Sequence, residues 1–145
     1  MSGLAALLAE HNPPGVYQWH NAAPAADVAH AVEHAGWAFR YLDGWTVEDK
    51  ESFLKAADAS LEVPDSAGES MGSLADAFDA LEVRERGLVL LWDGWSPLAR
   101  RDNETFETVL GALRHRAESQ AHGKLAVILR GEGPELELEE LPIKH

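Results

Sequence analysis

Apolar residues occur along this chain both as short unbroken runs and at helical intervals. The runs "GLVLLW" over 87–92 and "KLAVIL" over 124–129 are typical of strands that are buried on both faces of a parallel sheet. "WAFRYL" over 37–42 predicts a further core strand, which the Asp-Gly pair after it ends. "VYQW" over 16–19 predicts a short strand. The pattern therefore predicts several strands of one sheet.

Helical spacing of apolar residues fills the intervals between these strands. Helices are predicted over residues 3–11, about 25–34, about 46–60, 68–81 and about 103–120. Thr46 and Asp49 lie three positions apart and predict the capping pair of the third helix. The tail "ELELEEL" alternates, so it is either an edge strand or a frayed end. Because strands and helices alternate, the predicted class is α/β, with at least three parallel strands and right-handed connections.

The charge of the chain narrows the choice of partners. Its 145 residues, 46% of them hydrophobic, suit a single soluble domain with a real core. The formal net charge of −13 repels phosphate backbones and anionic lipids, so we expect neither a nucleic-acid nor a membrane partner. A basic protein partner is favoured. The alternative is that the acidity only keeps the protein soluble.

The cysteine content and the hydropathy of the chain indicate the cellular compartment of the protein. The chain has no cysteine, which excludes disulfides and thiolate chemistry and fits a reducing cytoplasm. The N-terminal run "LAALLA" is too short and lacks the basic flank of a signal peptide. No stretch reaches the roughly 18 to 20 apolar residues of a membrane helix. A cytoplasmic protein is therefore expected.

Candidate catalytic and metal-binding residues have simpler explanations. Asp43 and Asp93 follow predicted parallel strands, where open α/β sheets often bind ligands, but Asp-Gly is also a common turn pair, and the turn is favoured. His30 and His34 have a spacing that suits a shared metal, yet no third ligand is indicated, so surface histidines are favoured. We therefore expect no enzyme activity, no cofactor and no metal.

The five tryptophans divide into two predicted groups. Trp37 and Trp92 lie in predicted strands and are expected in the core. Trp19, Trp45 and Trp95 are candidates for partial exposure, although core or turn packing is favoured for most of the tryptophans. Trp45 and Trp95 each complete an Asp-Gly-Trp sequence at the end of a strand, which indicates two equivalent turns.

The segment "GESMGSLADAFDAL" over 68–81 combines an apolar face with an acidic one. Its apolar residues at helical intervals are Met71, Leu74, Phe78 and Leu81. The outward stripe carries Glu69, Gly72, Asp76 and Asp79. Like charges at such intervals destabilise a helix by about 0.2 to 0.5 kcal/mol per pair, so stability alone does not account for the stripe. Two interpretations remain: local capping through Ser73 and Asp76, or an interaction surface.

A set of motifs in a particular order resembles the barstar family of ribonuclease inhibitors. The motifs are Gly36-Trp37, "LDG" (42–44), "DKESFL" (49–54), "LEVP" (61–64), Gly68, Leu74, Asp76, Leu81, "LVLLWDGW" (88–95) and "FETVLGAL" (106–113). The resemblance covers about residues 36–130, and "PGVYQW" over 14–19 is similar to the N-terminal extension of longer bacterial members. It implies a small α/β fold with a parallel three-stranded sheet packed with helices, and an acidic helix that blocks a secreted ribonuclease.

The resemblance also implies a division of the chain. Residues 1–35 form an N-terminal helical extension that packs on the domain, and residues 36–130 form the barstar-like domain. Residues 131–145 form a C-terminal tail or edge strand.

The recognition helix of the family is matched only in part. The matching positions are Pro64, Gly68, Leu74 and Asp76. The departures are Ser66 and Ala67 in place of aromatic residues, Ser70 in place of asparagine and Gly72 in place of an interface aspartate. The acid that a later helix contributes in the family falls near His115. Aromatic and desolvated charged contacts often dominate an interface, so these departures weaken or redirect binding.

The resemblance implies one set of partner-binding residues and three competing functions. The set is Asp65, Glu69, Gly72, Ser73, Asp76 and Asp79. The first function is an intracellular inhibitor of a basic ribonuclease that imitates RNA phosphates. The second is an interaction module retargeted to another toxin or cellular partner. The third, much the weakest, is an enzyme that uses Asp43 and Asp93; a monomer is favoured throughout.

Overall fold

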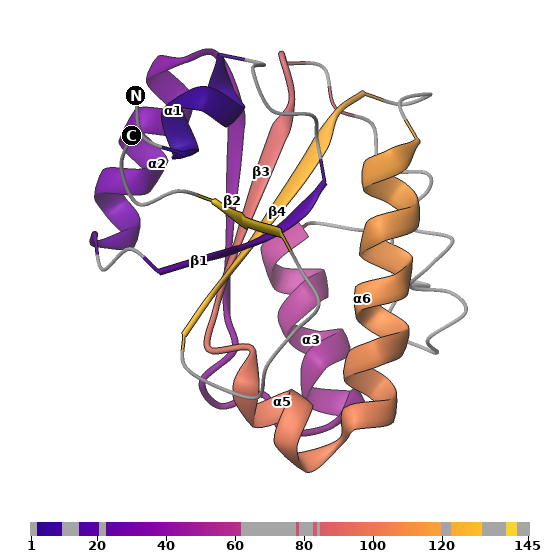
Figure 1. The fold of residues 1–145 in the computed structure, drawn as a ribbon. Helices are drawn as coiled ribbons and strands as arrows, with labels where there is room; N and C mark the ends of the chain where they lie inside the picture. Colours follow the sequence, from indigo (N-terminus) through magenta and orange to yellow (C-terminus); the bar gives the residue numbers. More distant parts are fainter. Residues whose placement is uncertain are drawn as a thin grey trace.

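The computed structural model describes residues 3–9, 15–20, 23–61, 78, 83, 85–119, 123–131 and 139–141. Its centre is a five-stranded sheet in the order β2-β3-β4-β1-β5, and every adjacent pair is parallel (Figure 1). The strands are β1 (Val16–Trp19), β2 (Ala38–Asp43), β3 (Leu88–Asp93), β4 (Leu125–Arg130) and β5 (Glu139–Leu141).

The α/β class with a parallel sheet is confirmed, but the predicted number of three strands is wrong. Strands β2, β3 and β4 are the expected three, β1 joins them as a fourth, and the three-residue β5 adds a fifth. Strand β1 pairs with β4 through Val16 and Val127, and β5 pairs with β1 through Glu139 and Tyr17. The N-terminal and C-terminal segments therefore complete one edge of the sheet.

Five helices within the described residues cover the two faces of the sheet. They are α1 (Gly3–Leu8), α2 (Ala25–His34), α3 (Lys50–Leu61), α5 (Ser96–Arg101) and α6 (Asn103–Glu118). Figure 1 shows α1 and α2 on one side of the sheet and α3 and α6 on the other, with α5 leading into α6. Helix α5 was not predicted. Right-handed strand–helix–strand connections place helices on both faces of a parallel sheet.

Two hydrophobic clusters follow from this layering. On the α3 and α6 side, Phe53 and Phe106 lie 5.3 and 5.7 Å from the ring centre of Trp92. The cluster on the α1 and α2 side includes Trp19 and Trp37. Trp19 and Trp95 are 3% and 0% exposed, so neither is partly exposed, in agreement with the packing favoured for most of the tryptophans.

The N-terminal segment contacts the sheet through polar as well as apolar groups. The indole Nε1–H of Trp37 donates to the carbonyl of Leu8 at 3.1 Å, in a buried position. This bond satisfies one of the free carbonyls at the end of α1. Within the described residues, each helix is too short or too polar to span a bilayer.

The capping pair of α3 lies three residues later in the chain than predicted. The Asp49 carboxylate accepts the backbone N–H of Ser52 at 2.9 Å, and the Ser52 hydroxyl accepts the N–H groups of Glu48 and Asp49 at 3.2 Å. The capping pair is therefore Asp49 with Ser52, not Thr46 with Asp49. Asp49 has the N-cap position because α3 begins at Lys50.

Candidate functional site

The predicted partner-binding residues lie outside the described residues. This applies to Asp65, Glu69, Gly72, Ser73, Asp76 and Asp79. Phe78, from the apolar face of the same segment, is described: it is helical, 1% exposed and part of the cluster that contains Trp92. The prediction that Phe78 faces the core is confirmed. The outward placement of the acidic residues stays a prediction.

A polar cluster lies at the carboxyl ends of the adjacent strands β2, β3 and β4. The registers of β2, β3 and β4 place Asp43 beside Asp93 and Asp93 beside Arg130. Arg130 donates two hydrogen bonds to Asp93, from Nε to Oδ1 at 2.6 Å and from Nη2 to Oδ2 at 2.7 Å. The Tyr41 hydroxyl donates to Oδ2 of Asp93 at 3.0 Å. The result is a bidentate, largely buried ion pair with a third hydrogen bond.

The protonation of this cluster follows from its contacts. Burial, the hydrogen bond to Asp93 and the charges of Asp93 and Asp43 together raise the pKa of Tyr41 to about 12, against the opposing charge of Arg130. The hydrogen bond to Asp93 raises the pKa of Arg130, although burial opposes it. Tyr41 is therefore neutral and Arg130 charged throughout the physiological range.

The two strand-end aspartates have different hydrogen-bond partners. Arg130 and Tyr41 occupy both carboxylate oxygens of Asp93. Asp43 uses Oδ1 to accept the backbone N–H of Trp45 at 3.2 Å, which closes an Asx-turn. The favoured explanation of Asp43 as a turn residue is thus confirmed. Asp93 has a different role, because it holds together two strands.

Arg130 connects the sheet to the segment before α2. Its Nη1 donates to the carbonyl of Ala23 at 2.6 Å, and its guanidinium carbon lies 6.0 Å from the ring centre of Trp19. Sequence reasoning missed Arg130. The available signal was that a basic residue ends one apolar strand and an aspartate ends another. The sequence does not show that the two residues lie in register, because strand register is a long-range property.

The two Asp-Gly-Trp turns pack against each other. The backbone N–H of Gly44 donates to the carbonyl of Asp93 at 2.7 Å, and that of Gly94 donates to the carbonyl of Arg130 at 2.9 Å. A β-carbon at Gly94 would lie 2.5 Å from the indole of Trp45, and one at Gly131 would lie 3.1 Å from it. The inner side of the Trp45 ring therefore lies over glycine, while 53% of the residue stays exposed. The expected partial exposure of Trp45 is confirmed.

His30 and His34 are both exposed on α2. The rings of His30 and His34 stack with centres 6.2 Å apart. Within the part of the chain that the structure describes, no group of three or more potential ligands surrounds them. The pair agrees with the favoured explanation as surface histidines.

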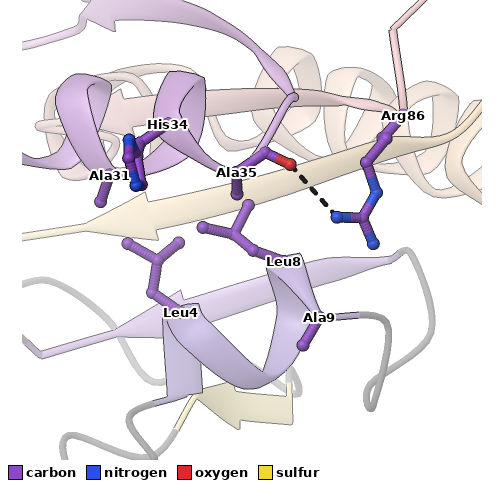
Figure 2. Close-up of a pocket in the computed structure, with 7 residues that line it drawn as sticks. All are labelled: Leu4, Leu8, Ala9, Ala31, His34, Ala35 and Arg86. Carbon is purple, nitrogen blue, oxygen red and sulfur yellow. Dashed lines mark hydrogen bonds between the residues drawn. The ribbon is translucent and has the colours of Figure 1, made fainter.

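A cavity of about 390 Å³ opens between α1 and α2 (Figure 2). Its lining residues are Leu4, Leu8, Ala9, Ala31, His34, Ala35 and Arg86. Figure 2 shows the two leucines of α1 directed toward Ala31 of α2 and Ala35 just after it, with Arg86 at one end. Arg86 donates from Nη1 to the carbonyl of Ala35 at 3.2 Å. Its lining combines apolar groups with the guanidinium of Arg86, which sets it apart from the acidic surface predicted for partner binding.

Comparisons with known proteins give two results, one on the fold of the chain and one on its family. A structure of the Aeropyrum pernix ORC2 protein, in ADPNP–ADP complexes, is similar with a TM-score of 0.61 and 14% identity. The similarity covers 90% of this chain but 38% of that one, and at this identity it shows the fold alone. A comparison with curated proteins found no match. The family model for Barstar (barnase inhibitor) matches residues 37–130, from the start of β2 to the end of β4, and the chain therefore belongs to the barstar family.

Proposed function

We propose that this protein inhibits a basic ribonuclease by placing an acidic helix in its active site. The observation that carries the proposal is the barstar family match over residues 37–130, which includes the whole segment 68–81. The burial of Phe78 supports the orientation in which the apolar face of that helix packs inward. The net charge of −13 suits a cationic partner.

Inhibition on this proposal works by imitation of RNA. Asp76 occupies the position of a substrate phosphate, and Glu69, Asp79 and Asp65 add flanking negative charge. Gly72 and Ser73 give the partner close access to the helix. Complementary charge accelerates encounter, so association is fast and sensitive to salt. The chain supplies binding surface alone, with no catalysis and no cofactor, and acts in the cytoplasm as a monomer.

A second function is favoured by specific departures from the family. Ser66, Ala67, Ser70 and Gly72 replace residues that usually anchor the ribonuclease. An interface that loses aromatic anchors and a desolvated charge binds more weakly. In this alternative the module binds a different toxin or cellular partner, and ribonuclease inhibition is lost.

A titration of the protein into a barnase-type ribonuclease distinguishes the two functions. Inhibition predicts that RNA cleavage falls as the protein is added and that the affinity weakens as salt rises. Full ribonuclease activity at micromolar excess of the protein would instead support the retargeted module.

The variant Asp76→Asn tests which surface acts. We expect it to slow association and to reduce the salt dependence of binding, because it removes the central charge without changing side-chain size. Asp27→Asn is the matched control, since Asp27 is an exposed acid in the first turn of α2. Equal reductions of the association rate and of its salt dependence in both variants would mean that binding depends on net charge alone.

A further inference from the structure

Trp45 differs from every other tryptophan of the chain in its exposure. Trp19, Trp37, Trp92 and Trp95 are at most 3% exposed, whereas Trp45 is 53% exposed. Tryptophan offers a large apolar area, and burying it is strongly favourable. Exposed tryptophan is over-represented where proteins bind one another. A ring left open to this extent therefore requires an explanation.

The local sequence does not force the exposure. Trp45 and Trp95 end the same Asp-Gly-Trp sequence after neighbouring strands, yet Trp95 is fully buried and packs 5.5 Å from the ring centre of Phe106. The inner side of Trp45 lies over Gly94 and Gly131, where the chain has no side chains. This close backing restricts the ring before any partner arrives, which lowers the entropic cost of binding.

The surroundings of Trp45 are aromatic and acidic. Asp43 is exposed and lies beside Trp45 through the bond from the Trp45 N–H to Oδ1. Tyr41 is 36% exposed, and Tyr41 and Asp43 are among the residues that line a cavity of about 290 Å³ beside α3. The following exposed residues are Glu48, Asp49, Lys50 and Glu51, so acids outnumber bases. The surface therefore attracts cations and repels phosphates.

We propose that Tyr41, Asp43 and Trp45 form a docking surface for an arginine-containing segment of a protein partner. A guanidinium stacks on the open side of the Trp45 indole and donates to the Asp43 carboxylate. Arginine suits this surface better than lysine, because its planar fork both stacks on an aromatic ring and pairs with a carboxylate. The surface is separate in sequence from the segment 68–81, so it does not depend on ribonuclease inhibition.

The first test follows the indole Nε1–H signal of Trp45 by NMR during titration with the peptide acetyl-Arg-Arg-Arg-amide. The variant Trp45→Phe identifies the signal. We expect a saturable shift of this signal, a smaller shift with the tri-lysine peptide and none with a short oligothymidylate. A Trp45 signal that moves with the oligothymidylate, or equally with both peptides, would overturn the proposal.

The second test separates this surface from the overall negative charge. Trp45→Ala and Asp43→Asn should each weaken binding of the tri-arginine peptide by about three- to thirtyfold, as expected for loss of a cation–π or charged contact. Asp43→Asn keeps the oxygen that accepts the Trp45 N–H, so the turn is retained. Asp27→Asn removes the same charge from α2 and should change the affinity much less. Equal affinities in all four proteins, each checked for native circular dichroism, would assign binding to net charge and reject the surface.

Discussion

At the scale of single residues, the pair Asp93 and Arg130 ties together segments that are far apart in sequence. The two side chains are 12% and 11% exposed, and their charges are desolvated together. Removing one partner of such a pair leaves an uncompensated charge, whereas removing both often has little effect. The stability of the strand ends thus depends on both residues being present.

Arg130→Met should lower the free energy of unfolding by about 3 to 5 kcal/mol, measured by urea denaturation. The double variant Asp93→Leu/Arg130→Met should recover much of that loss, because it removes both charges. If the double variant is as unstable as the sum of the two single variants, the pair is not coupled as described.

Tyr41 should ionise near pH 12, about two units above an ordinary tyrosine. Because the folded pKa is raised, the stability from this group is fully present below pH 10 and is lost as pH rises through 12. Absorbance titration of Tyr17→Phe, which leaves Tyr41 as the remaining tyrosine, measures the midpoint. A midpoint near pH 10 in folded protein would contradict the hydrogen bond to Asp93.

Residue roles were predictable from sequence where they depend on near neighbours. Asp43 bonds to a backbone group two positions away, and Asp-Gly indicated that turn correctly. The same dipeptide at Asp93 gave no hint of Arg130, which is 37 positions away.

At the scale of elements, the cap of α3 offers a direct test. Asp49→Ala should lower the melting temperature, whereas Thr46→Ala should leave it nearly unchanged, because Ser52 bonds to Asp49. Circular dichroism melts measure both. A larger decrease of the melting temperature in Thr46→Ala than in Asp49→Ala would instead support Thr46 and Asp49 as the capping pair.

The stabilisation that the Asp49 cap gives to α3 should decrease as the pH falls. The N–H and hydroxyl of Ser52 hold the pKa of Asp49 below its ordinary value of 3.8. A depressed folded pKa means that the stabilisation is present above pH 3.8 and is lost as pH falls through the folded value. The difference in melting temperature between wild type and Asp49→Ala should therefore shrink in acid.

Phe78 connects the stability of the domain to the proposed acidic helix. Phe78→Ala should lower the free energy of unfolding by about 3 to 5 kcal/mol, because it leaves a cavity in the core. If the acidic face depends on this anchor, inhibition should weaken as well. Phe78→Leu retains most of the volume and is the control; equal stability of Phe78→Ala and wild type would contradict the packing described.

Most elements were predictable because their apolar patterns are local. Strands β2, β3 and β4 and helices α2 and α6 lie within about two residues of their predicted bounds. Helix α5 was missed since its six residues are too few to show a helical period. The pairing of β1 with β4 depends on residues more than a hundred positions apart, which no local pattern reports.

At the scale of the whole molecule, the sheet depends on the N-terminal segment. The α1 and α2 side of the core combines residues of that segment with residues of the central strands. The central-strand members are Val89, Leu91, Ala126 and Ile128. Without β1, strand β4 would have an unpaired edge, and such edges promote aggregation.

A chain shortened to residues 36–145 should therefore aggregate or bind a hydrophobic dye strongly, in contrast to the full chain. Size-exclusion chromatography and dye fluorescence measure the difference. A monomeric shortened protein with full stability would show that residues 1–35 are an independent addition to the domain.

The position of β1 between β4 and β5 also constrains synthesis on the ribosome. Strand β1 precedes the other described strands in the chain, but its two neighbours, β4 and β5, are made last. More than a hundred further residues must be synthesised before the backbone of β1 can pair with these strands. During that interval the apolar surface of a nascent chain is open to chaperones, and the rate of translation past Arg130 governs how long that exposure lasts.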